Sequence, residues 1–280
     1  MATTTMKPAT DAAGRNFVPR EHGATAMLLT PFFAAAILVR QFSWLELVAL
    51  AAVGCALAIK DPLVVLARQR LVWKQEHAET KQARRSVAVE FVLLAACGLV
   101  LLLFRDWRPL IPLFVAAAGF TLLAVTMNVR NRQRSQWFQV ASAVALTSTA
   151  LAACLSARGN IAGWCWLLWM LSAMQATAGI FVVHARLDAR VAARKGDAQA
   201  SGSRRAAFVC EFVLLAAAVT FAFFGHFWIA AALLAAAAGY FLELRRQKNP
   251  GSLQMSLKRV GQEALALSIA YSLMVTIGLW

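Results

Sequence analysis

The residue types best suited to chemistry include a histidine and an acid at the end of one apolar stretch. His184 and Asp188 are four residues apart, so on a helix their side chains share a face. There the imidazole can accept a proton near neutral pH or orient a ligand. A histidine at a helix C-terminus is also favoured by the helix dipole alone. We therefore treat both residues as candidate catalytic groups with a structural alternative.

A second candidate site precedes the first apolar stretch, where Arg20 and His22 stand on either side of Glu21. The N-terminus of a helix offers free N–H groups and a partial positive charge, which suit an anion. Arg20 and His22 would add charge-assisted hydrogen bonds to phosphate oxygens. In the alternative reading, Glu21 serves the helix dipole and His22 lies at the membrane interface.

Two acids, Glu90 and Glu211, stand inside long apolar stretches. An acid within a membrane-spanning segment is costly and marks a ligand-binding site by default. Each also lies one to two turns after an Arg pair, so pairing with a nearby arginine is the alternative. The five cysteines lie in apolar stretches without C-x-x-C spacing, which indicates small buried side chains rather than disulfides or a metal site.

These residues are positioned by apolar segments, because the chain is 60% hydrophobic with a mean hydropathy of +0.63. Continuous apolar runs predict helices, since a transmembrane barrel strand alternates in polarity. We therefore expect an all-α integral membrane protein with about nine transmembrane helices. The expected spans are residues 24–39, 44–60, 86–104, 109–127, 136–157, 161–183, 206–224, 226–244 and 260–279.

Positive charge is distributed unequally between the two sides of these spans. Of the 28 Lys and Arg, only Arg40, Arg105, Arg108 and Arg158 fall in the odd-numbered loops. Short loops rich in Lys and Arg stay in the cytoplasm, which places the N-terminus inside and the C-terminus outside. The net charge of +15 therefore indicates contact with anionic membrane lipids rather than with nucleic acid.

An internal repeat links the third and seventh spans. The seven residues from Glu90 to Ala96 are identical to those from Glu211 to Ala217, and each string follows a basic loop and an Arg pair. The repeat predicts a parallel duplication of four-helix units, whose paired loops would surround a shared site. We expect a disordered cytoplasmic tail over residues 1–18 and one transmembrane domain over 19–280, with pseudo-repeats near 44–157 and 161–280.

Nine spans, long loops after the second and sixth, and a four-helix duplication resemble the UbiA superfamily of intramembrane prenyltransferases. In that family Asp-rich motifs begin both long loops and hold Mg²⁺ against a prenyl diphosphate. Here the loops read Lys60-Asp61-Pro62 and His184-Ala185-Arg186-Leu187-Asp188, with a single acid at the start of each. The resemblance implies Asp61 and Asp188 as catalytic residues and Mg²⁺ ligands. It also implies a basic phosphate site, formed by Arg68, Asn128, Arg130, Arg132 and Arg186.

The N-terminal segment is similar to that of YwiC-like proteins, a bacterial membrane family, in the run Pro19-Arg20-Glu21-His22-Gly23-Ala24-Thr25-Ala26-Met27. The His-Gly-Ala core carries the resemblance, which implies a multi-pass protein of the inner membrane. The expected function is binding or transfer of an isoprenoid or other lipid phosphate in a cavity facing the cytoplasm. The alternatives are a membrane transporter and a non-catalytic membrane partner protein.

Overall fold

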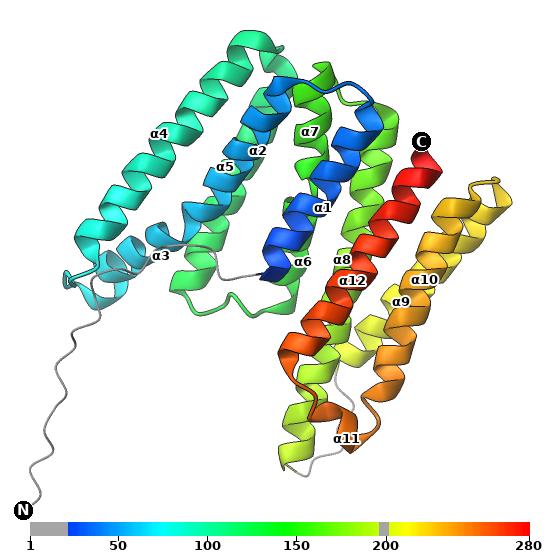
Figure 1. Ribbon diagram of the computed structural model, residues 1–280. Helices are drawn as coiled ribbons and strands as arrows, with labels where there is room; N and C mark the ends of the chain where they lie inside the picture. Colours follow the sequence, from blue (N-terminus) through cyan, green and yellow to red (C-terminus); the bar gives the residue numbers. More distant parts are fainter. Residues whose placement is uncertain (1–21, 196–201) are drawn as a thin grey trace, which may run out of the picture.

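The computed structural model describes residues 22–195 and 202–280, and this part of the chain is helical without strands (Figure 1). The tail expected over residues 1–18 and the candidate residue Arg20 lie outside the described residues. The expectation of an all-α integral membrane protein is confirmed, because eight helices are long and apolar enough to cross a bilayer. The first helix adds a shorter apolar segment, Ala24–Val39.

In the described ranges the chain passes along the bundle nine times. The helices are α1 (His22–Val39), α2 (Trp44–Ala58), α3 (Lys60–Arg68), the π-helical turn η1 (Gln69–Trp73), α4 (Thr80–Phe104), α5 (Trp107–Val129), α6 (Gln136–Thr147), α7 (Thr149–Arg158), α8 (Gly163–Lys195), α9 (Gly202–Phe223), α10 (Phe227–Arg246), α11 (Pro250–Leu253) and α12 (Leu257–Leu279). Each expected span coincides with one pass.

Two of the basic segments expected as loops are largely helical. The second pass continues through α3 and η1 to Trp73, and α8 continues twelve residues beyond the expected span end at 183, to Lys195. The sequence from 184 to 195 is rich in Ala and Arg, which favour helix even outside a membrane. Hydropathy marks where the apolar part of a helix ends, whereas the helix itself ends later.

The second pass bends where α2 gives way to α3. Pro62 lies in the first turn of α3, where its missing N–H removes no internal helix bond. Asp61 therefore lies in the first turn of α3, directly after the break between the two helices. The fifth pass bends between α6 and α7 at Ser148, whose hydroxyl donates to the Ala145 carbonyl. Such local hydrogen bonds compete with the helix ladder and bend helices.

The two halves of the chain repeat most of their helix contacts. In the first half α4 packs on α2 and α3, and α5 packs on α3; in the second, α9 and α10 both pack on α8. The last pass of each half, α7 or α12, also contacts the first. The halves differ in that α9 packs closely along α10, and this contact has no equal between α4 and α5. α1 lies between the halves, against α6, α7, α8 and α12.

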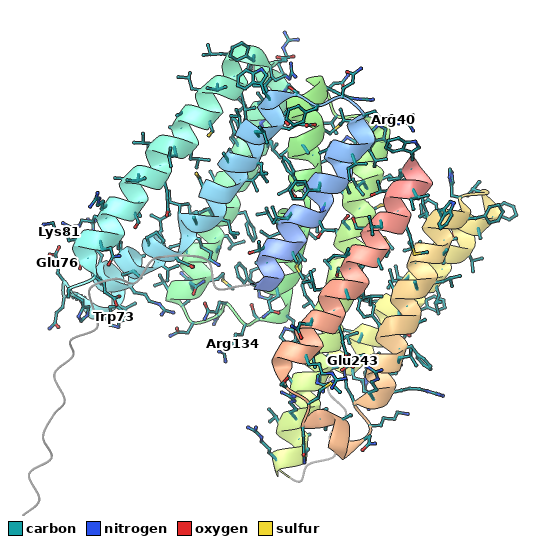
Figure 2. All side chains as sticks on the ribbon, viewed as in Figure 1. Arg40, Trp73, Glu76, Lys81, Arg134 and Glu243 are labelled. Carbon is teal, nitrogen blue, oxygen red and sulfur yellow. The ribbon has the colours of Figure 1, made fainter. Side chains whose placement is uncertain are left out.

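Charged side chains concentrate at one end of the bundle. Trp73, Glu76, Lys81, Arg134 and Glu243 lie near this end, and Arg40 lies at the other (Figure 2). We call it the basic end and define it by residues 61–85, 128–135, 184–195, 202–205 and 245–259. Between the ends the outer surface carries apolar side chains, as a lipid-facing surface does.

Candidate functional site

A cavity of about 890 Å³ lies between α1, α8, α10 and α12 and extends to the basic end. It is within the size range of sites for drug-sized ligands and cofactors, about 300 to 1,000 Å³. Much of its wall is apolar, including Met27 of α1, Ile180 of α8, and Leu265 and Leu267 of α12. The cavity combines one helix that precedes both repeat units with three helices of the second unit.

Two glycines bring helices together beside this cavity. A Cβ atom on Gly179 would lie 3.0 Å from Oη of Tyr240, and one on Gly239 would lie 2.8 Å from Cδ2 of Leu267. The absence of these side chains lets Tyr240 of α10 reach the backbone of α8 and lets Leu267 of α12 approach α10. Both packed residues line the cavity, so the glycines define its shape.

A polar cluster lies part way along the cavity. The Nε2 atom of Gln175 donates to Oη of Tyr240 at 2.7 Å and to Oγ of Ser268 at 2.9 Å. The Tyr240 hydroxyl donates to the carbonyl of Gln175 at 3.0 Å, and the Tyr271 hydroxyl donates to the carbonyl of Leu171, also at 3.0 Å. These bonds join α8, α10 and α12 and place polar atoms within an apolar cavity.

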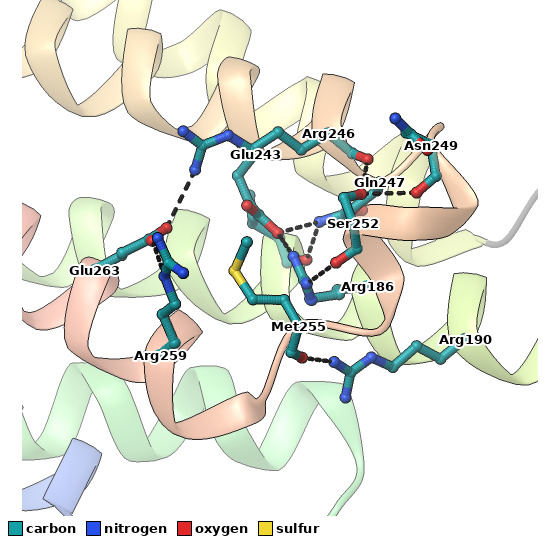
Figure 3. A network of polar contacts seen from close by, with 11 residues as sticks. Arg186, Arg190, Glu243, Arg246, Gln247, Asn249, Ser252, Met255, Arg259 and Glu263 are labelled. Atoms are coloured by element: carbon teal, nitrogen blue, oxygen red, sulfur yellow. Dashed lines mark hydrogen bonds and ion pairs between the residues drawn. The ribbon is translucent and has the colours of Figure 1, made fainter.

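Ion pairs surround the mouth of the cavity at the basic end (Figure 3). Arg246 Nη1 lies 3.1 Å from Oε2 of Glu263, which joins α10 to α12, and Arg259 Nε lies 3.4 Å from Oε1 of the same glutamate. Arg186 forms an ion pair with Glu243. Glu243, Arg246 and Glu263 line the cavity, so charged groups lie where a ligand would enter or leave it.

The connection between α10 and α12 is tied to α8 beside this mouth. Arg186 donates to the carbonyl of Ser252 at 2.6 Å, and Arg190 donates to the carbonyl of Met255. Gln247 Nε2 donates to the carbonyl of Val182 at 3.2 Å. The sequence predicts Arg186 as a ligand-binding residue, and the structure shows its guanidinium held by Glu243 and Ser252.

The candidate residues of the first half gather around α3, away from the cavity. Asp61 lies 3.8 Å from the Nζ atom of Lys60, and its charge acts on the Glu90 carboxylate. Arg68 donates to the carbonyl of Asn128 at 2.8 Å and to Oδ1 of Asn131 at 3.0 Å. Arg130 and Arg132 are exposed in the turn that follows α5. The contacts of Arg68 thus join α3 to the basic turn that follows α5.

The candidate residues of the second half lie where α6, α8 and α9 meet. His184 Nε2 is 2.9 Å from Oε1 of Gln139, and Asp188 accepts a hydrogen bond from Ser203 at 2.6 Å. Gln136 also donates to Ser203. Glu211 of α9 is buried, and His22 begins α1. His184 and Asp188 are four residues apart on α8, as the sequence predicts, and both form hydrogen bonds to neighbouring helices.

The resemblance to the UbiA superfamily implies Mg²⁺, which takes about six oxygen ligands in octahedral geometry. Across the described parts of the chain, no group of three or more His, Cys, Asp or Glu side chains is placed to hold a metal ion. Asp61 interacts with Lys60, and Asp188 accepts a hydrogen bond from Ser203. Mg²⁺ held partly by a bound phosphate therefore stays a prediction.

The cavity was not evident from the sequence, although some of its polar residues were. A glutamine in the middle of an apolar stretch is unusual enough to draw attention to Gln175, and Glu263 follows two basic residues. Nothing in the sequence pairs Gln175 with Tyr240 and Ser268, because these residues are 65 and 93 positions away.

Comparison with known proteins gives one match. The sequence model of the family described as YwiC-like protein matches residues 18–154. The matched region runs from before α1 into α7, so it includes one of the four helices around the cavity. No curated protein matches the chain, and no solved structure matches it.

Proposed function

Because residues 18–154 match the model of the YwiC-like family, we propose that the chain binds an isoprenoid or other lipid phosphate in the cavity between α1, α8, α10 and α12. The apolar chain of the lipid occupies the wall region around Ile180 and Leu267. Its phosphate lies at the mouth, near Arg246. The proposed setting is a bacterial inner membrane, with the basic end in the cytoplasm.

The observation that carries this proposal is an apolar cavity with Arg246 at its mouth and further arginines in the network around it. The network of Figure 3 contains Arg186, Arg190, Arg246 and Arg259 but only two glutamates, Glu243 and Glu263. Arginine binds phosphate with two parallel hydrogen bonds, which makes it well suited to a lipid head group. Arg246 and Arg259 are both more than half exposed, so a phosphate can reach them when Glu263 gives way.

Transfer of the prenyl group is a separate step beyond binding. His184, Asp61 and Asp188 stay the residues predicted for it, with Mg²⁺ supplied together with the phosphate. None of the three lines the cavity. Product formation that is lost in Asp61→Ala or Asp188→Ala would add an enzymatic step to the proposed binding.

The binding proposal is tested on the purified protein in lipid nanodiscs. We expect geranylgeranyl diphosphate to raise the melting temperature, because a ligand that binds the folded state stabilises it. Arg246→Gln should weaken this binding about tenfold, since a charged hydrogen bond contributes about 1.5 to 3 kcal/mol. The matched control is Arg245→Gln, because Arg245 lies over the Phe241 ring, 4.9 Å from its centroid, and does not line the cavity.

A second pair of variants tests where the lipid chain lies. Ala264→Phe places a ring in the cavity and should abolish the shift, whereas Ala270→Phe, on an exposed part of the same helix, should preserve it. The same measurement is repeated with EDTA to test dependence on Mg²⁺. No shift with the wild-type protein, with or without Mg²⁺, would overturn the proposal.

Transport is the second candidate, and a second hollow favours it. A space of about 350 Å³ lies between the same helices α1 and α12 near the opposite end, lined by Ile37, Leu273, Thr276, Ile277 and Trp280. Arg40 lies over the Trp280 ring, 4.1 Å from its centroid, and donates to the carbonyl of Trp280, so it ties the two helices together there. Movement of an unaltered probe across proteoliposomes would support transport, and its absence would favour binding alone.

A further inference from the structure

The polar cluster within the cavity has hydrogen-bonding capacity that the protein does not use. The Tyr240 hydroxyl has one hydrogen, and it goes to the Gln175 carbonyl. Its oxygen must therefore accept from the Gln175 amide, which fixes the orientation of that amide. The second amide hydrogen goes to Ser268. Both donors of Gln175 are satisfied, and its Oε1 atom receives no hydrogen bond from any residue that the structure describes.

Ser268 supplies the complementary group, a hydroxyl hydrogen. Its Oγ atom accepts from Gln175, but it donates no hydrogen bond to the described part of the protein. Three other hydroxyls of the cavity wall are satisfied within their own helices: Thr30 donates to Ala26, Thr147 to Ala143, and Ser172 to Leu168. The open donor of Ser268 and the open acceptor of Gln175 lie on side chains that are hydrogen-bonded to each other.

Unused polar atoms are costly in such surroundings. Gln175 is only 7% exposed, and the cavity around it is largely apolar. A ligand that covers these two atoms without bonding to them would leave them buried and unpaired, at about 1 to 3 kcal/mol each, so a ligand that supplies the missing bonds is favoured. A single ligand group that both donates and accepts a hydrogen bond satisfies Oε1 of Gln175 and the hydroxyl of Ser268.

We propose that Gln175 and Ser268 form a recognition site for a hydroxyl group carried on the apolar part of the ligand, as in a phenol or an alcohol. The ligand O–H donates to Oε1 of Gln175, and the ligand oxygen accepts from Ser268. An ether or a ketone can use only Ser268, and a hydrocarbon can use neither. Ser268 is five residues after Glu263, which places the hydroxyl about 8 Å along α12 from the charged mouth. This inference deepens the proposed function, since it uses the same cavity.

The test uses two probes that differ only at this group, 4-nonylphenol and its methyl ether, 4-nonylanisole. Their dissociation constants are measured with the full chain in nanodiscs. We expect the wild-type protein to bind the phenol about tenfold more tightly, because the ether cannot donate. Ser268→Ala should weaken the binding of both probes, because each accepts a hydrogen bond from this hydroxyl, whereas Gln175→Leu should reduce the preference for the phenol to about twofold or less. Ser142→Ala should keep it, because the Ser142 hydroxyl donates to the Phe138 carbonyl and lies outside the cavity.

Melting temperatures without probe establish that each variant is folded. Ser268→Ala removes a single oxygen, so it tests the inference even if Gln175→Leu does not fold. Equal affinity of the wild-type protein for both probes would overturn the inference, as would unchanged affinity of Ser268→Ala for both probes. Geranylgeranyl diphosphate, which has no hydroxyl on its chain, is measured in parallel. If it fails to bind while the phenol preference holds, the lipid phosphate proposal fails and the hydroxyl site stands.

Discussion

Arg186 is a charged side chain with only 1% of its surface exposed, and its environment explains how it is tolerated there. It pairs with Glu243 of α10 and donates to the carbonyl of Ser252, so its charge is compensated from two sides. A buried charge is tolerated when it is paired and hydrogen-bonded. The residue thus connects α8 to α10 and to the segment that follows α10.

Removing one member of this pair should destabilise the protein strongly. We expect Arg186→Met to lower the free energy of unfolding by about 3 kcal/mol, because it leaves Glu243 without its partner in a mostly buried position. The double variant Arg186→Met with Glu243→Met should recover most of the loss, since no charge is then left unpaired. Unfolding in mixed detergent measures the free energy of unfolding of the single and the double variant. Equal stability of the wild-type protein and Arg186→Met would show that the pair contributes little.

The sequence alone predicts a ligand-binding role for Arg186, because a basic residue near His184 and Asp188 resembles part of a phosphate site. Its partner Glu243 is 57 residues away and looks like an ordinary interfacial acid. Whether Arg186 binds a ligand or pairs with Glu243 depends on how α8 and α10 pack. Local sequence patterns carry no information about that packing. Ser203 and Gln139, which bond to Asp188 and His184, were missed for the same reason.

At the level of helices, a close contact between α10 and α12 depends on Gly278. A Cβ atom there would lie 2.7 Å from Cγ1 of Ile229 and 3.0 Å from the backbone nitrogen of the same residue. The backbone atom cannot move aside as a flexible side chain can. The contact lies away from the basic end and holds together two helices that form the cavity further along.

Gly278→Ala should therefore destabilise the protein by about 1 to 3 kcal/mol, the usual effect of overpacking. The control is Gly261→Ala on the same helix, where an added Cβ atom meets nothing within 4 Å. This control should be neutral or slightly stabilising, because alanine favours helix over glycine by about 1 kcal/mol. Thermal unfolding of the two variants measures this difference in stability. If Gly278→Ala is as stable as Gly261→Ala, the close contact between α10 and α12 does not depend on Gly278.

Hydropathy predicts the nine passes well, because each must be apolar over about the same length. It does not predict helix ends, as α3 and α8 show, since these continue into basic segments. The repeated string from Glu90 to Ala96 also forms part of the outer surface. Its Phe91 and Val92 are exposed, as are Phe212 and Val213 of the second copy, so both copies present apolar side chains to lipid.

For the whole molecule, the separation of charge between the two ends predicts its orientation. We expect the basic end to face the cytoplasm, because Lys and Arg are retained on that side. A cysteine placed at Gln133, in the exposed turn before α6, should react with a membrane-impermeant thiol reagent only after cells are opened. A cysteine at Asn160, exposed between α7 and α8, should react in intact cells.

The native cysteines give this experiment a low background, because all five are buried or half-buried within the helices. The unmodified protein, treated in the same way, serves as the control. The opposite pattern of labelling would reverse the proposed orientation and would place the mouth of the cavity outside the cell.

The length of α8 has a consequence for how a ligand moves. Its 33 residues give a rod about 50 Å long, whereas the hydrocarbon core of a bilayer is about 30 Å thick. Arg186 is about 35 Å along this rod from Gly163, at the depth of the lipid head groups. The ion pair between Arg186 and Glu243 therefore lies in the hydrated head-group layer of the membrane. If the cavity binds a lipid phosphate as proposed, the phosphate at its mouth would stay in the hydrated layer while the apolar chain stays at the depth of the hydrocarbon core.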